Sequence, residues 1–71
     1  MATAETASRP VILIPRADAD LALLQERTGL SGTDLINRAV QLYEFIDAQM
    51  ATGTEILLRS PDGMCSVLHL G

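Results

Sequence analysis

The chain has few of the residues that usually stabilise a very small protein. Its 71 residues include one cysteine, Cys65, and one histidine, His69. A single cysteine excludes an intrachain disulfide framework, and these two side chains are too few for a structural zinc site, which takes about four soft ligands. A chain this short buries little surface when it folds alone. Since 48% of its residues are hydrophobic, we expect self-association, with no metal and no cofactor.

Lysine is absent, so every side-chain cation other than His69 is an arginine guanidinium. Five arginines stand against nine acidic residues, and the formal net charge is −4. The net negative charge is greatest in residues 41–71, where four acidic residues stand against one arginine, Arg59. This balance disfavours a generic nucleic-acid binder, because such proteins usually carry a basic patch.

Long apolar runs and catalytic motifs are also missing. No run approaches the ~20 residues of a membrane span, and residues 1–8 lack the charged and apolar regions of a secretory signal. We therefore expect a cytoplasmic protein with no membrane partner. The sequence offers no nucleophile–base pair, glycine-rich phosphate loop or carboxylate pair with a chemical rationale, so we expect no enzymatic activity.

The most informative stretch is "RPVILIPR", Arg9 to Arg16. Its central residues, 11–14, are β-prone, and the flanking prolines restrict such a strand to the edge or end of a sheet. We therefore predict a strand over residues 10–15. Residues 1–8 show no periodicity and are predicted to be a disordered arm.

Two helices are predicted after this strand. The segment "ADADLALLQERTG" places Leu21 and Leu24 on one face, Asp18 in the first turn, and Gly29 where a left-handed residue would end the helix. Ser31 and Asp34 form an S-x-x-D capping box, which predicts a second helix from about residue 32. Helical spacing then relates the following apolar residues: Leu35, Ile36, Ala39, Leu42, Tyr43, Ile46 and Met50.

The segment "TEILLRSPDGMCSVLHL" predicts a β-hairpin. Proline and glycine in Ser60–Gly63 suit a turn, because proline presets φ and glycine permits a positive φ. If Arg59 pairs with Met64, one apolar face should pack inward, with the cysteine as a small buried hydrophobe. That face contains Ile56, Leu58, Cys65 and Val67.

The order of strand, short helix, "TGLSGTDLI" and long helix resembles the ribbon-helix-helix family, of the Arc, MetJ and CopG type. The matching residues run from about Arg9 to Met50 and include "ILIP", "RTGLS" and "TDLINRAVQLY". The resemblance implies an α+β fold: an intertwined homodimer whose paired strands cover four helices, formed by residues 9–52. Residues 53–71, the hairpin, would be a C-terminal extension. The implied dimer core contains Ile12, Ile14, Leu21, Leu24, Leu35, Ile36, Ala39, Tyr43 and Ile46.

The resemblance also implies DNA-contacting positions. In DNA-binding members the paired strands enter the major groove, and the start of the second helix meets a phosphate. Carried onto this chain, Arg9, Val11 and Leu13 would face the groove, and Arg16 would reach the DNA backbone beside the ribbon. The helix start that would face the phosphate consists of Ser31, Gly32 and Thr33.

The apolar character of Val11 and Leu13 leaves the function open. Base edges are read by hydrogen bonds, which neither side chain can make. Three interpretations remain: the hairpin or tail covers them, they form a partner-binding surface, or they make an apolar DNA ribbon. Ser31 and Asp34 likewise fit a simple helix cap as well as a phosphate site.

Two functions follow from these alternatives. The first is a small transcriptional regulator of the autorepressor or antitoxin type, bound to operator DNA. The second is a protein-interaction adaptor that keeps the dimeric scaffold without reading DNA and binds a protein partner, such as a toxin.

Overall fold

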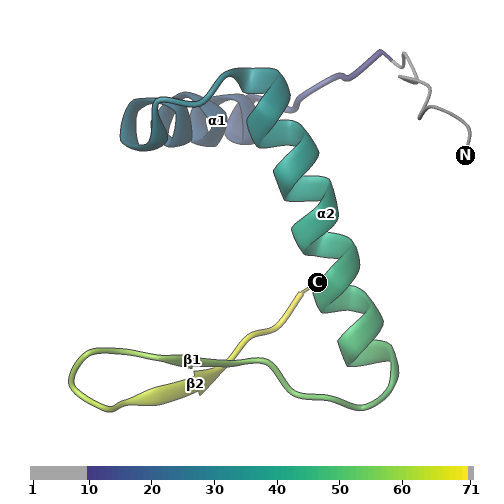
Figure 1. Ribbon diagram of the computed structural model, residues 1–71, viewed down its shortest axis with the longest axis vertical. Helices are drawn as coiled ribbons and strands as arrows, with labels where there is room; N and C mark the ends of the chain where they lie inside the picture. The colour runs from purple at the N-terminus through teal and green to yellow at the C-terminus, as the bar shows by residue number, and fades with distance from the viewer. Residues whose placement is uncertain (1–9, 71) are drawn as a thin grey trace, which may run out of the picture.

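The computed structural model describes residues 10–70, so the predicted N-terminal arm and Arg9 lie outside the described residues. Two helices, α1 (Pro15–Thr28) and α2 (Gly32–Ala51), precede a two-stranded antiparallel sheet (Figure 1). Its strands are β1 (Leu57–Arg59) and β2 (Cys65–Val67). The predicted α+β class is confirmed, with two helices and a hairpin in the predicted order.

Residues 10–14 run as a drawn-out segment into α1, and they are not a strand in the single chain (Figure 1). The predicted strand over residues 10–15 does not form within one chain, because a strand needs a hydrogen-bonded neighbour and none of the other described segments pairs with this one. Its predicted neighbour is the same segment of a second chain. α1 also begins earlier than predicted, at Pro15. Proline suits the first helical position, since its missing N–H would have no partner there and its φ is already helical.

The junction between the helices follows the prediction. Gly29 ends α1 with φ 71° and ψ 7°, and its N–H donates to the carbonyl of Gln25. A residue with a side chain is disfavoured in this left-handed conformation. Ser31 caps α2, because its hydroxyl oxygen accepts a hydrogen bond from the backbone N–H of Asp34 at 3.1 Å.

The hairpin forms, but with a different register from the prediction. Arg59 pairs with Cys65 rather than Met64, and the loop holds three residues, Pro61 to Gly63. The N–H of Gly63, at φ 90°, donates to the Ser60 carbonyl, and the N–H of Ser60 donates to the Met64 carbonyl. This is the three-residue loop with a left-handed glycine that is common in hairpins.

The one-residue shift changes which side chains share a face, because strand side chains alternate with a period of two. The predicted inward face is wrong: Leu57, Arg59, Cys65 and Val67 lie on one face, and Leu58 and Ser66 lie on the other. All six are exposed, and neither strand contacts a helix.

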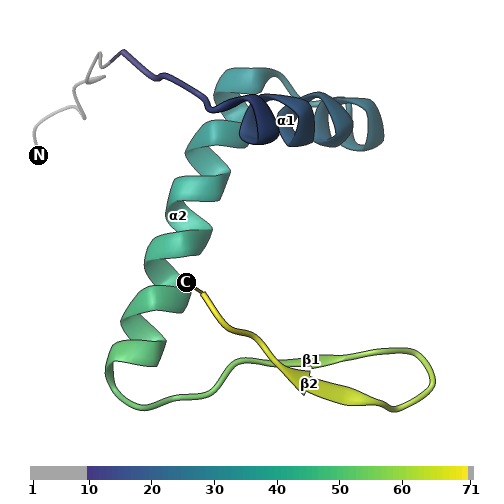
Figure 2. The same ribbon diagram turned by 180° about the vertical axis from the view of Figure 1, so that it is seen from behind.

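The helices and the hairpin make an open, C-shaped chain. α1 and the hairpin leave opposite ends of α2 and extend toward the same side (Figures 1 and 2). The helices contact each other near their junction, and Leu35 of α2 is the only buried residue among residues 10–70, at 7% exposure. The core of the single chain is therefore little more than one side chain.

Candidate functional site

An apolar hollow of about 220 Å³ lies between α1 and α2. Leu35 forms part of its wall, and the extended segment contributes one side chain, Leu13. The structure thus brings together five residues that the sequence assigned to a shared core, while Ile12, Ile14, Tyr43 and Ile46 do not line this hollow. Its full lining is Leu13, Ala17, Asp20, Leu21, Leu24, Leu35, Ile36 and Ala39.

In the single chain, the side of the extended segment that faces the helices is the one predicted to face outward in the dimer. Leu13, expected to face outward, is half-buried and lines the hollow. Ile12 and Ile14, expected to face inward, are 93% and 66% exposed. α1 starts directly after Ile14, so the direction in which the chain enters the helix places Leu13 over the hollow. Both sides of the segment are apolar, because Val11 is exposed as well.

A second uncovered surface runs along the middle of α2. Tyr43, predicted as core, is more than half exposed, and so are Val40, Leu42 and Phe45. Ile46 is only half-buried. Apolar side chains thus cover most of the circumference of α2, but α1 packs against only its first half. Such a helix normally lies inside a larger core.

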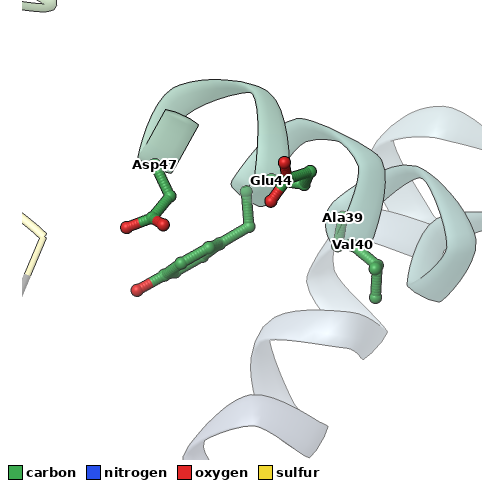
Figure 3. A pocket seen from close by; sticks show the side chains of 5 residues that line it. Ala39, Val40, Glu44 and Asp47 are labelled. Atoms are coloured by element: carbon green, nitrogen blue, oxygen red, sulfur yellow. The ribbon is translucent and has the colours of Figure 1, made fainter. Parts of the chain in front are cut away.

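A shallow groove on this surface is lined by α2 alone, through Ala39, Val40, Tyr43, Glu44 and Asp47 (Figure 3). Val40 and Asp47 project from the same side of the helix. The groove therefore has an apolar floor with two carboxylates beside it. Ala39 lines both the groove and the hollow, so the two join into one strip along α2.

Sequence reasoning missed this groove, because the acidic side chains of Glu44 and Asp47 interrupt the apolar pattern along this side of α2. The signal was present in the spacing: Val40, Tyr43, Glu44 and Asp47 stand three, four and seven residues apart, so they line one side of a helix. The alternation of apolar and acidic residues within that side concealed it.

The start of α2, predicted to face a phosphate, serves the fold in the described chain. The hydroxyl oxygen of Ser31 is occupied by the cap. Gly32 is half-buried against α1, where a Cβ would lie 3.6 Å from Gln25 Nε2 and 3.7 Å from Leu21 Cδ2. Its small size thus allows the helices to approach, although these distances would still accommodate alanine. Thr33 is exposed.

Arg16 is the only cation among the described residues predicted to contact DNA. It is exposed in the first turn of α1, and its Nε lies 4.0 Å from a carboxylate oxygen of Asp20. This is the one ion pair within residues 10–70. An exposed pair of this kind contributes little to stability, so Arg16 is held only loosely and its guanidinium is accessible.

The whole chain exposes 6529 Å², against ~4,300 Å² for a compact monomer of its mass. Residues 1–9 can account for at most ~1,300 Å² of the difference, which is the surface of a fully unfolded segment of that length. At least ~900 Å² of excess surface therefore remains per chain. Two chains that buried it together would form an interface of ~1,800 Å², within the range of stable protein complexes.

The remaining features add no second site. No cluster of three or more metal-ligating side chains occurs in residues 10–70, and neither helix is long and apolar enough to cross a membrane. Comparison of the chain with protein-family models, with curated proteins and with solved structures found no match. The apolar strip along α2 and the apolar segment before α1 are therefore the features that indicate a binding function.

Proposed function

We propose that the chain is a non-enzymatic homodimer of the ribbon-helix-helix type that acts as a small DNA-binding transcriptional regulator. The observation that carries the proposal is an extended apolar segment leading into two helices whose shared hollow and outer faces are not covered by any other part of residues 10–70. A second copy would supply that cover: its segment would pair with residues 10–14, and its α2 would lie over the hollow between α1 and α2.

The proposed dimer assigns roles to the sequence-predicted residues. The leucine-lined hollow would become part of one shared core, which would include Ala39 and Ile46 and would have Tyr43 at its rim, beside the groove. Arg16 and the start of α2 would lie beside the paired segments, where accessible guanidinium groups and free helix N–H groups favour phosphate. Since few cations are available, binding to DNA would be weak in total and strongly reduced by salt.

Light scattering and DNA titration test this proposal separately. Light scattering should give the mass of a dimer, twice 7.6 kDa. Fluorescence anisotropy with the DNA upstream of the protein's own coding sequence should show binding at ~50 mM salt that weakens as salt rises. Arg16→Ala should weaken it further, whereas Arg27→Ala, at the far end of α1, should not. If the protein is a dimer but does not bind this DNA under these conditions, the proposal that it regulates its own gene is contradicted.

A second candidate, a dimeric protein-interaction adaptor, is favoured by one specific observation. Whichever side of the 10–14 segment faces the helices, the other side presents apolar groups: Ile12 and Ile14 in the described chain, or Val11 and Leu13 in the predicted phase. Neither pair can hydrogen-bond to base edges. Two such pairs side by side in a dimer would make an apolar patch of the kind that marks a protein interface.

Replacing the most exposed of these side chains distinguishes the candidates. Ile12→Ser should leave dimerisation and DNA binding intact if the side chain contacts only a protein partner, and should abolish recovery of that partner in a pull-down. Under the regulator proposal the same change should alter the affinity for operator DNA. An unchanged set of recovered partners would count against the adaptor function.

A further inference from the structure

The hairpin is the part of the molecule that the proposed function leaves unexplained. Both of its faces carry apolar side chains, with Leu57 60% and Met64 69% exposed, and neither strand contacts a helix. An isolated two-stranded hairpin is at best marginally stable in water, and it normally needs a further strand or a helix to pack against. Its apolar side chains therefore call for a partner surface outside its own helices.

The groove on α2 matches the hairpin in chemistry. The groove combines the apolar Val40 and Tyr43 with the carboxylates of Glu44 and Asp47 (Figure 3). One face of the hairpin combines Leu57 and Val67 with Arg59, the only arginine in residues 41–71. Arg59 makes no ion pair within residues 10–70. An apolar surface with one guanidinium thus complements an apolar groove with two carboxylates.

The shape of the chain favours contact between two molecules. The hairpin leaves the end of α2 and extends toward the side taken by α1, away from the middle of the helix (Figures 1 and 2). The excess exposed surface also fits this arrangement, because helix contacts and an exchanged hairpin could together bury the ~1,800 Å² available to two chains.

We propose that, in the homodimer, the hairpin of each protomer docks in the α2 groove of its partner, where Arg59 lies between Glu44 and Asp47. The occupant of the groove is therefore a second copy of this chain. This inference rests on the proposed dimer, and it assigns to residues 53–71 the role of a clasp that the two protomers exchange. The same contact would hold Leu57 and Val67 against Val40 and Tyr43.

Charge reversal tests the proposed ion pairing, because reversing both partners should rescue the dimer affinity that reversing one partner lowers. In sedimentation equilibrium, Arg59→Glu should raise the dissociation constant of the dimer at least ~10-fold, because it places like charges together. Glu44→Arg with Asp47→Arg should have a similar effect. The three substitutions together should restore most of the affinity. As a matched control, Arg59→Glu combined with Glu26→Arg and Asp18→Arg on α1 should not be rescued. A triple variant as weak as Arg59→Glu alone overturns the pairing.

Paramagnetic broadening determines whether the contact joins two protomers. A nitroxide is attached to Ser66→Cys in a Cys65→Ser background, on the hairpin face opposite Arg59. This chain is mixed with an isotope-labelled Cys65→Ser chain that carries no nitroxide. The amide signals of residues 40–47 of the isotope-labelled chain should broaden, whereas those near Glu26 should not. Broadening of the amide signals of residues 40–47 confirms that the hairpin of one protomer docks on the other.

Two other outcomes overturn the inference and can be told apart. A monomer at all concentrations refutes the proposed dimer and the exchange with it. A dimer without broadening of residues 40–47 in the mixed sample refutes only the exchange. In that case, broadening within a singly labelled chain would show that the hairpin or the C-terminal tail covers its own α2.

Discussion

The two halves of the molecule are stabilised in different ways. The helical half, residues 15–51, has well-formed helix ends and an apolar hollow, but only Leu35 is buried. The hairpin half is held by backbone hydrogen bonds and by a loop network in which the Asp62 carboxylate accepts from the Ser60 hydroxyl and the Met64 N–H. The helical half contains an incomplete hydrophobic core, whereas the hairpin half is held by local hydrogen bonds and has no core.

This difference indicates where stabilisation must come from. Local bonds define the shape of each half, but such bonds contribute little to stability unless apolar surface is also buried. The helical half presents apolar surface in a hollow that a partner can fill, whereas the hairpin presents it on two flat faces. Substitutions in the helical half should therefore affect the folding of each protomer. Substitutions in the hairpin loop should act on the hairpin and, through its docking, on the affinity of the dimer.

The largest effect should follow from truncating Leu35, the one buried side chain within residues 10–70. Leu35→Ala removes packing at the junction of α1 and α2 and should lower the free energy of unfolding by ~2–5 kcal/mol. Urea unfolding monitored by circular dichroism measures this loss. Leu23→Ala on α1 is the matched control, because Leu23 is more than half exposed. Equal losses at the two positions would contradict a core centred on Leu35.

The cap of α2 should have the next largest effect. Ser31→Ala removes the acceptor for the Asp34 N–H and should cost about 1 kcal/mol of stability. The same urea experiment measures it, and Ser31→Asp should restore most of the loss because aspartate also accepts at this position. Ser66→Ala, on the exposed face of β2, should change stability much less. Full stability of Ser31→Ala would show that the cap is dispensable.

Two glycines allow the halves to be compared directly. Gly29 and Gly63 both have positive φ, at 71° and 90°, and nothing lies within 4 Å of a Cβ built on either. Alanine should therefore cost about 1 kcal/mol at each position through backbone strain alone. Gly29→Ala should lower the free energy of unfolding of the helices. Gly63→Ala should reduce the population of the hairpin, as amide chemical shifts of residues 57–67 would report, and should weaken the dimer only through that loss. Unfolding of α1 and α2 in Gly63→Ala would contradict the local character of the loop.

The elements that the sequence predicted well are those whose signals are local. Ser31 and Asp34 placed the start of α2 correctly, and Gly29 marked the end of α1, because a cap and a left-handed glycine depend only on neighbouring residues. The hollow was also foreseeable, because helical spacing had identified an apolar face on each helix. Leu21 and Leu24 of α1 and Leu35, Ile36 and Ala39 of α2 belong to these faces and line the hollow.

The predictions failed for features that depend on how one segment pairs with another, and not only on residues adjacent in the sequence. The register of the hairpin depends on whether the loop holds three residues or four, and the sequence "SPDG" suits either, so one residue decided which face Cys65 joins. The facing of residues 11–14 could not be inferred from alternation, because all four side chains are apolar and both phases look alike. The groove at Glu44 and Asp47 was hidden by its mixed chemistry.

The smallest effect concerns pH and the loop of the hairpin. The Met64 N–H and, second, the Ser60 hydroxyl hold the pKa of the Asp62 carboxyl below its ordinary value of 3.8, because both bonds favour the charged form. A lowered pKa in the folded state means that this contribution is complete above the unfolded-state value and is lost as pH falls through the folded value. The hairpin should therefore weaken only below about pH 3.8.

A nuclear magnetic resonance titration of the amides of residues 60–64 from pH 6 to pH 2 measures this dependence. Asp62→Asn keeps the acceptor oxygen but cannot titrate there, so its hairpin signals should not follow the Asp62 transition. Since Asp62 is fully exposed, solvent screens the interaction, and the global stability of the dimer should scarcely change over the same range. A folded-state pKa at or above 3.8 would mean that the loop carboxylate gains nothing from these two bonds. The hairpin would then depend on its docking partner more than on its turn.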